Sequence, residues 1–174
     1  MKNDIKSSDA KWKVVILHKA IYSNGSHYDD GDVKGMRDQL SALLPYLGVD
    51  LVLQGHDHVY LRTDVMNANA VVPVKTGTVT YEGMEYQMKY NPKGSIYSIC
   101  GTSGVKVYQT KDVEATDRLF PRAEKLNPEN TENSMFAAIT VDGDCLYYNA
   151  YEVDDGEAVR VDNFAIEKTA DESP

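Results

Sequence analysis

Four histidines are the residues of this chain best suited to chemistry, and all of them lie in its first third. They are His18, His27, His56 and His58. His18 ends one apolar run, and the sequence Gly-His-Asp-His at positions 55–58 directly follows another. Neutral imidazole is the commonest protein ligand for transition metals, and open α/β sheets bind their ligands beyond the carboxyl ends of strands. The spacing therefore predicts a metal site formed by His18, His56 and His58. His27, taken alone, is interpreted as an ordinary surface residue.

A strand, a helix and a second strand must position these histidines. Residues 12–17 contain four consecutive apolar residues, which is typical of a parallel strand buried on both faces. A helix is expected from Asp32, whose side chain can cap it, to about Leu47, with its apolar residues at helical spacing and Arg37 facing outward. Residues 49–53 form the second strand. Because neighbouring parallel strands end at the same rim of a sheet, this βαβ unit predicts that its histidines converge.

The chain beyond residue 63 is rich in short predicted strands. Runs of β-branched residues and tyrosines alternate with glycine, proline or asparagine at residues 71–74, 77–81, 86–90, 95–100 and 105–108. The pair Asp142-Gly143 predicts a hairpin turn between strands at 135–141 and 145–153, with a last strand at 159–168. Residues 1–10 are expected to be an irregular lead-in, and residues 112–132 to be polar with a short helix at 118–125. We therefore expect one domain over residues 1–174 of the α/β (α+β) class, with a βαβ unit at 11–63 followed by a β-rich region at 64–168.

Charge and hydropathy exclude several classes of function. A net charge of −9 argues against non-specific nucleic-acid binding, which needs basic surface. No window approaches the roughly 20 apolar residues of a membrane span, and residues 1–13 lack the apolar core of a signal peptide. The cellular location is left open, with a secreted or periplasmic parent protein as one expectation. Cys100 and Cys145 form no CxxC pattern, and two half-buried strand thiols are favoured over a disulfide.

Two motifs give the chain a resemblance to a known family. Val-Ile-Leu-His at positions 15–18 resembles the VxxH motif of the calcineurin-like metallophosphoesterases, and Gly-His-Asp-His at 55–58 resembles their terminal GHxH motif. The longer pattern over residues 12–63 is similar to the purple acid phosphatase branch, and it includes His27-Tyr28, Asp30-Gly31, Arg37 and Tyr60-Leu61-Arg62. The resemblance implies the C-terminal half of a two-sheet αββα sandwich.

The resemblance also implies roles for the histidines. His18 and His56 would ligate one metal ion, and His58 would ligate a second. His27 would lie over the phosphate of a phosphate ester substrate, binding it or protonating the leaving alcohol. Members of the family hold two metal ions, commonly iron together with zinc, manganese or a second iron.

Three further residues are candidates at the edge of this site. Asp57 would either orient a ligand imidazole, as carboxylates beside metal sites often do, or remain a solvated loop residue. Tyr60 and Arg62 are candidates for substrate contact, with rim or packing roles as the simpler interpretation.

The chain departs from the family in its upstream half. None of the aspartate and asparagine motifs that supply the family's oxygen ligands precedes His18, so at most one metal ion is expected here. We expect a C-terminal fragment of a two-metal phosphoesterase acting on phosphate monoesters, weak or inactive alone. Its partner would be the missing N-terminal half or a second copy, because half of the fold leaves a sheet edge open. The alternatives are a non-enzymatic binding or assembly module, and a one-zinc hydrolase with Asp29, Asp30 or Asp57 as its general base.

Overall fold

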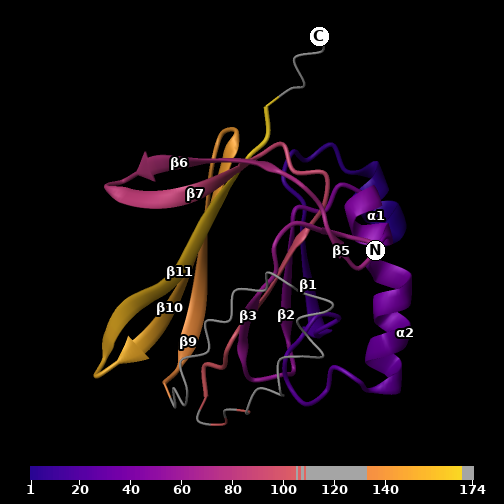
Figure 1. The fold of residues 1–174 in the computed structure, drawn as a ribbon, viewed down its shortest axis with the longest axis horizontal. Coiled ribbons are helices and arrows are strands. Elements are labelled where there is room, and N and C mark those ends of the chain that lie inside the picture. The colour runs from indigo at the N-terminus through magenta and orange to yellow at the C-terminus, as the bar shows by residue number, and fades with distance from the viewer. Residues whose placement is uncertain (105, 107, 109–132, 170–174) are drawn as a thin grey trace.

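The computed structural model describes residues 1–104, 106, 108 and 133–169. Figure 1 shows three layers, in which helices cover one face of a first sheet and a second sheet covers its other face. The helices are α1 (Lys2–Ser7), α2 (Gly31–Leu40) and α3 (Leu43–Tyr46). The strands are β1 (Val14–Lys19), β2 (Leu51–Gly55), β3 (Tyr60–Arg62), β4 (Met66–Asn67), β5 (Ala70–Val71), β6 (Lys75–Tyr81), β7 (Met84–Tyr90), β8 (Ile96–Cys100), β9 (Met135–Asp142), β10 (Cys145–Asp154) and β11 (Glu157–Glu167).

The first sheet has the strand order β1-β2-β8-β3. Strands β1, β2 and β8 are parallel, and β3 runs antiparallel to β8. The chain passes from β1 through α2 and α3 to β2, so the predicted βαβ unit is confirmed. Apolar side chains from the sheet, the loop after β1 and α3 form the core under the helices, including Ile21, Leu44, Val52, Leu61 and Tyr97.

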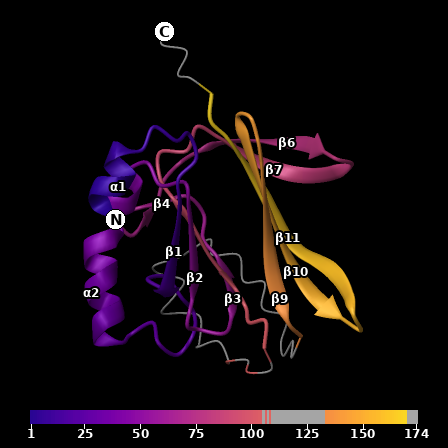
Figure 2. The ribbon, with the colours of Figure 1, turned by 180° about the vertical axis from the view of Figure 1, so that it is seen from behind.

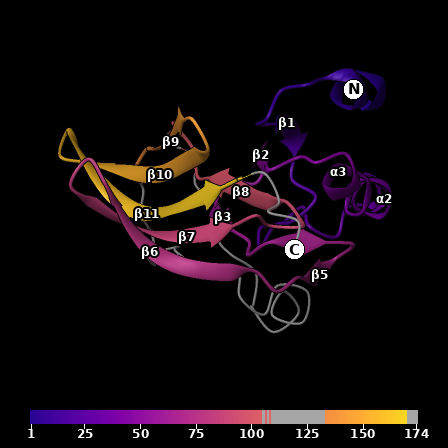
Figure 3. The same ribbon diagram turned by 90° about the horizontal axis from the view of Figure 1, so that it is seen from above.

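The second sheet has the strand order β6-β7-β11-β10-β9, and it forms most of the predicted β-rich region. Strands β9 and β10 form the predicted hairpin, whose turn places Gly143 at a φ of 54°. The two sheets enclose a second core that includes Leu51, Ile96, Leu146, Tyr148 and Phe164. Figure 3 shows the two sheets lying against each other from above, and Figure 2 shows the β6–β7 hairpin lying across one end of the long β9–β11 strands. The mixed α/β class, with a βαβ unit followed by a β-rich region, is confirmed.

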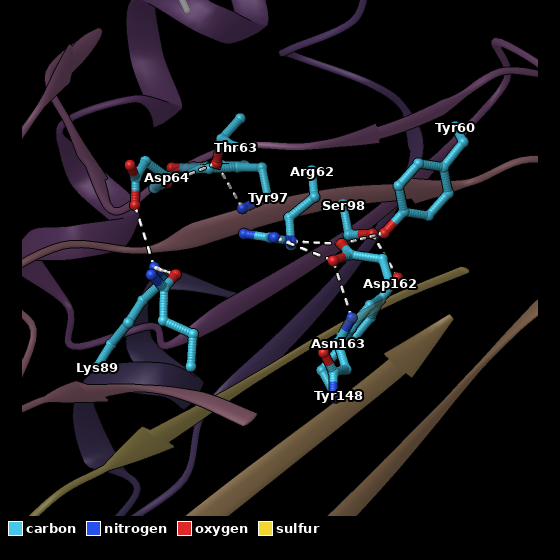
Figure 4. Close-up of polar contacts among 11 residues, drawn as sticks. Tyr60, Arg62, Thr63, Asp64, Lys89, Tyr97, Ser98, Tyr148, Asp162 and Asn163 are labelled. Carbon is cyan, nitrogen blue, oxygen red and sulfur yellow. Dashed lines mark hydrogen bonds and ion pairs between the residues drawn. The ribbon is translucent and has the colours of Figure 1, made fainter. Parts of the chain in front are cut away.

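Two ion pairs of opposite polarity join the sheets (Figure 4). Arg62 of β3 donates from Nε and Nη2 to the two carboxylate oxygens of Asp162 on β11, at 2.5 and 3.1 Å. Both side chains are buried, at 4% and 6% exposure. Lys89 of β7 is also buried, and its Nζ lies 3.2 Å from Oδ1 of Asp64, just after β3. Because each pair must keep both partners in register to satisfy a buried charge, the pairs fix how one sheet lies on the other.

Strand β1 is the outer edge of the first sheet, and no described strand of the second sheet covers its face on that side. Val14 and Ile16 lie opposite Leu51 and Leu53, whose side chains pack in the core between the sheets. Yet Val14 is 41% exposed and Ile16 78% exposed. The prediction that this strand is buried on both faces is therefore wrong, because the described part of the second sheet ends at β9 and does not extend over β1. An exposed edge with apolar side chains invites further strand pairing.

Three predictions for the helical region are wrong. The expected lead-in contains helix α1. The expected single helix is divided into α2 and α3, because the Ser41 carbonyl would need the N–H of Pro45, which proline lacks, and instead accepts from the N–H of Ala68 at 3.1 Å. Arg37 faces inward rather than outward, because buried carbonyls of the loop after β1 accept its guanidinium hydrogens.

Other predictions for single segments have mixed outcomes. Helix α2 has Asp30 rather than Asp32 as its N-cap residue. Cys100 and Cys145 are free and half-buried on β8 and β10, as predicted. The helix expected at 118–125 lies outside the described residues. Of the strand expected at 105–108, only residues 106 and 108 are described.

A separate finding concerns membranes: among the residues described, no helix has the length and apolarity needed to cross one.

Candidate metal and phosphate site

The ends of β1 and β2 bring His18 and His56 together. The register between these strands shifts after Ile16, so that Lys19 rather than His18 lies opposite Gly55. Irregularities of this kind re-aim a side chain at the end of a strand. His56 adopts a φ of 69°, in the left-handed region that non-glycine residues rarely occupy. As a result, His56 Nδ1 lies 3.2 Å from His18 Nε2, which fulfils the predicted convergence of these two imidazoles.

The loop that carries His27 is buried and held by polar side chains. Gln54 of β2 accepts from the N–H of Ile21 at 2.8 Å and donates to the carbonyl of Tyr22 at 3.2 Å. Arg37 of α2 donates to the carbonyls of Ile21 and Tyr28, at 2.7 and 2.6 Å. The loop therefore has a defined path, although its sequence indicated only turns. The signal that could have revealed it is a glutamine at the end of an otherwise apolar strand, since a buried amide must find backbone partners.

Asp57 fastens the same loop from the other side. Its carboxylate accepts from the hydroxyl of Ser23 at 2.5 Å and from the backbone N–H of His27 at 3.2 Å. A Cβ at Gly25 would lie 2.4 Å from the Asp57 carboxyl carbon, so the loop passes directly over this side chain. Asp57 is 2% exposed, and the solvated-loop alternative is therefore wrong. Its described contacts orient the backbone that carries His27 rather than an imidazole ring.

His27 completes a cluster with His56 and Asp30. The His27 and His56 ring centroids are 4.3 Å apart, and His27 Nδ1 lies 3.0 Å from Oδ2 of Asp30. One ligand atom from each of these three residues lies within 4.8 Å of the other two. Within the described ranges this is the one group of three or more metal-ligating side chains. His27 is thus part of the site rather than an isolated surface residue.

The charges around His56 favour its neutral form. Desolvation lowers the pKa of His56, and the charges of His27, Lys19 and His18 lower it further. Metal ions bind imidazole only when it is deprotonated. The surroundings of His56 therefore prepare it as a ligand.

His58 faces a different neighbour. Its ring stacks on Tyr108 at a centroid distance of 4.6 Å and an interplanar angle of 12°, and its Nδ1 contacts the Lys106 carbonyl. Tyr108 also lies 6.0 Å from His27, so it borders both imidazoles. Tyr108 could not be selected from the sequence, because it lies 50 positions beyond His58. Ligation of a metal by His58 stays a prediction.

Tyr60 and Arg62 do not lie at the rim. Both are buried between the sheets, where the Tyr60 hydroxyl donates to Asp162 at 2.6 Å beside the guanidinium of Arg62 (Figure 4). Burial raises the pKa of Tyr60 far above its ordinary range, and the nearby Tyr148 and Asp162 raise it further. The packing interpretation fits this arrangement, and substrate contact does not. A buried arginine such as Arg62, at the end of β3, needs an anionic partner. That partner is Asp162, which lies on a strand 100 residues away in sequence.

The donor set at the rim fits one transition-metal ion. Imidazole nitrogens with a carboxylate oxygen suit zinc and other borderline divalent ions. The described residues offer a single three-ligand group there, and the expectation of at most one ion for this chain stays a prediction.

Comparison with known proteins points to one family for the first third of the chain. Residues 1–60 match the sequence model of the calcineurin-like phosphoesterases. Purple acid phosphatase 17 of Arabidopsis thaliana is 46% identical over 54 residues, which cover 31% of this chain and 15% of that protein. Purple acid phosphatase 18 of the same plant is 37% identical over 71 residues, covering 38% of this chain and 16% of that protein. The matched part is thus a small share of the relatives' length.

Solved structures with a related arrangement are more distant. Vacuolar Protein Sorting 29 from Cryptosporidium parvum aligns with 92% of this chain and 55% of that chain, at 13% identity and a TM-score of 0.38. Vps29 from Chaetomium thermophilum aligns with 90% and 56%, at 12% identity and a TM-score of 0.36.

Proposed function

We propose, because residues 1–60 carry the sequence of the calcineurin-like phosphoesterase family, that this chain is the C-terminal part of a two-metal phosphoesterase. The complete enzyme would hydrolyse phosphate monoesters, and the 174-residue chain alone would be weak or inactive. The convergence of His18, His27 and His56 at one rim carries the proposal. These residues come from the same segment that matches the family.

The side chains at the rim have distinct proposed roles in the complete enzyme. His18 and His56 bind one metal ion and His58 binds the other, as the resemblance implies. Bound ions would supply Lewis acidity toward the phosphoryl oxygens and an activated water. His27 binds the phosphate or protonates the leaving alcohol. Asp30 supports that role, since a carboxylate at Nδ1 fixes the ring and leaves Nε2 available to the substrate.

The uncovered face of β1 supports the view that a further segment completes the fold. Val14 and Ile16 point toward the space between the sheets but remain exposed. Covering an apolar side chain of this size contributes about 1.5–3 kcal/mol. An N-terminal half that extends both sheets would cover these residues and bring the missing carboxylates to the rim.

The same exposed edge favours the second candidate, a binding or assembly module. An edge strand with apolar side chains can pair with another protein without any catalysis. The two candidate functions require different residues. A module needs β1 and not the histidines, whereas the enzyme needs both.

The test compares two products of the gene, the 174-residue chain and a longer product that includes any coding sequence upstream of Met1. Hydrolysis of an aryl phosphate is measured with iron, zinc or manganese present. We expect negligible turnover from the chain alone and metal-dependent turnover from the longer product, lost in its His56→Ala variant. Equal turnover by the two products would contradict the fragment proposal. An upstream sequence without aspartate motifs, together with inactive products, would favour the module.

A further inference from the structure

The imidazole of His56 lies between two possible sets of partners. On one side is His18, with the rings in an edge contact at 5.1 Å. On the other side is His27, whose ring is closer at 4.3 Å and is already joined to Asp30. The family resemblance pairs His56 with His18 and calls for carboxylates from aspartate motifs, none of which precedes His18 in this sequence. This chain supplies its own carboxylate on the other side.

The second set has the dimensions of a metal site. Zinc bound tetrahedrally at about 2.0–2.2 Å keeps its ligand atoms about 3.4 Å apart. His27 Nδ1 and Asp30 Oδ2 are 3.0 Å apart, and all three ligand atoms of the group with His56 lie within 4.8 Å of one another. Rotations of half-buried side chains are enough to close that difference. His18 Nε2 lies 3.2 Å from His56 Nδ1 but does not belong to this three-residue group.

The elements that carry these ligands are well fixed. The backbone of His27 is held by Asp57, which is itself buried. Asp30 is the N-cap residue of α2 and accepts the N–H of Lys34 at its carbonyl. His56 follows β2 directly. Preorganised ligands lower the cost of binding an ion.

We propose that this chain binds a single transition-metal ion, such as Zn²⁺, through His27, Asp30 and His56, in place of the His18, His56 and His58 set that the resemblance implies. This inference takes only one element from the proposed function, the location of the site at the ends of β1 and β2. It has one consequence for activity. A metal bound to His27 occupies the imidazole that the complete enzyme uses toward its substrate, so the one-ion state is unproductive.

Zinc affinity, measured by calorimetry on the 174-residue chain and its variants, tests this assignment. We expect about one ion per chain. His56→Ala, His27→Gln and Asp30→Asn should each weaken binding by about 100-fold or more, since even residues that only support metal ligands contribute 10- to 100-fold. His58→Ala is the matched control and should change affinity by less than about threefold. Far-UV circular dichroism without zinc establishes that each variant is folded.

The outcomes separate this inference from the proposed function. Loss of binding in His58→Ala with normal binding in Asp30→Asn would overturn the inference and would favour the ligand set implied by the family. The absence of zinc binding by the unmodified chain would also overturn it, while leaving turnover by the longer gene product as an independent test of the phosphoesterase. Normal binding in Asp30→Asn with His58→Ala also normal would remove the carboxylate from the site and equally contradict the inference.

Discussion

Replacing Asp162 by asparagine should destabilise the protein more than any surface charge change. Asp162 accepts hydrogen bonds from Nε and Nη2 of Arg62, at 2.5 and 3.1 Å, and from the Tyr60 hydroxyl at 2.6 Å. The Arg62 and Asp162 side chains are only 4% and 6% exposed. The Asp162→Asn variant keeps the shape of the side chain but leaves the guanidinium buried without its anion. Breaking a buried pair in this way costs about 3–5 kcal/mol, a large share of the roughly 5–15 kcal/mol that stabilises a domain.

The assay is thermal unfolding, followed by circular dichroism. For a chain of this size, 1 kcal/mol corresponds to about 2–4 °C, so Asp162→Asn should lower the Tm by about 6–20 °C. The matched control is Asp144→Asn, which breaks a surface pair with Lys11 whose side chains are 60% and 39% exposed. Surface pairs contribute about 0–1 kcal/mol, so this change should lower the Tm by no more than about 4 °C. Equal effects of the two variants would refute the role assigned to the buried pair.

A double variant separates the pair from its packing. Arg62→Met combined with Asp162→Leu removes both charges and keeps apolar volume between the sheets. Such replacements are often neutral or stabilising, so the double variant should be more stable than Asp162→Asn alone. The Tyr60 hydroxyl would then lose its acceptor, which costs about 1–3 kcal/mol, and Tyr60→Phe added to the double variant should recover that loss.

The remaining predictions concern the edge strand, a thiol and the pH response. Ile16→Lys should reduce self-association, measured by sedimentation velocity. The control Tyr46→Lys changes an equally exposed apolar residue on α3 and should leave self-association unchanged. Equal changes in the two variants would contradict pairing through β1. Burial raises the pKa of Cys100 to about 11, so little thiolate forms at pH 8. In a Cys145→Ser background, alkylation of Cys100 at pH 8 should therefore be about 100-fold slower in the native chain than in denaturant. Equally fast labelling of the native chain would disprove this burial. The lowered pKa of His56 means that the unfolded chain binds more protons near its ordinary value of about 6.5. Stability without metal should therefore fall as pH decreases below about 6.5, and His56→Gln should have a smaller fall between pH 7.5 and 5.5; an identical fall would show that other groups cause it.

Local patterns predicted the elements of this fold well where they depend on neighbours in sequence. The apolar run before His18 and the Asp142-Gly143 turn each act over a few residues. The convergence of His18 and His56 followed from one rule about parallel strands. The division between α2 and α3 could also have been anticipated, because Pro45 has no backbone N–H to donate to the preceding turn of a helix.

The unsuccessful predictions depend on contacts between distant segments. Arg37 was expected in solvent, yet it holds carbonyls of a loop that precedes its helix. The sequence leaves Arg62 between substrate contact and a rim or packing role, because its partner Asp162 lies on β11, the last described strand along the chain. Periodicity assigns a side chain to a face of its own element, but it does not reveal which charged residue another element brings to that face.

The exposed side of β1 has a different cause. Four consecutive apolar residues indicate burial on both faces, and the side chains of Val14 and Ile16 do face the space between the sheets. Their exposure reflects the extent of the second sheet rather than their own sequence. The pattern and the exposure agree if another segment covers β1 in the complete protein, as proposed above.

The location of a bound metal ion tests the central claim most directly. Crystals of the chain grown with one equivalent of Zn²⁺, measured at the zinc absorption edge, would place the ion without reference to activity. The account predicts one anomalous peak at the rim after β1 and β2, about 2.0–2.1 Å from a nitrogen of His56 and adjacent to His27 and Asp30. Zinc bound elsewhere on the chain, with the three rim residues free of metal, would contradict it.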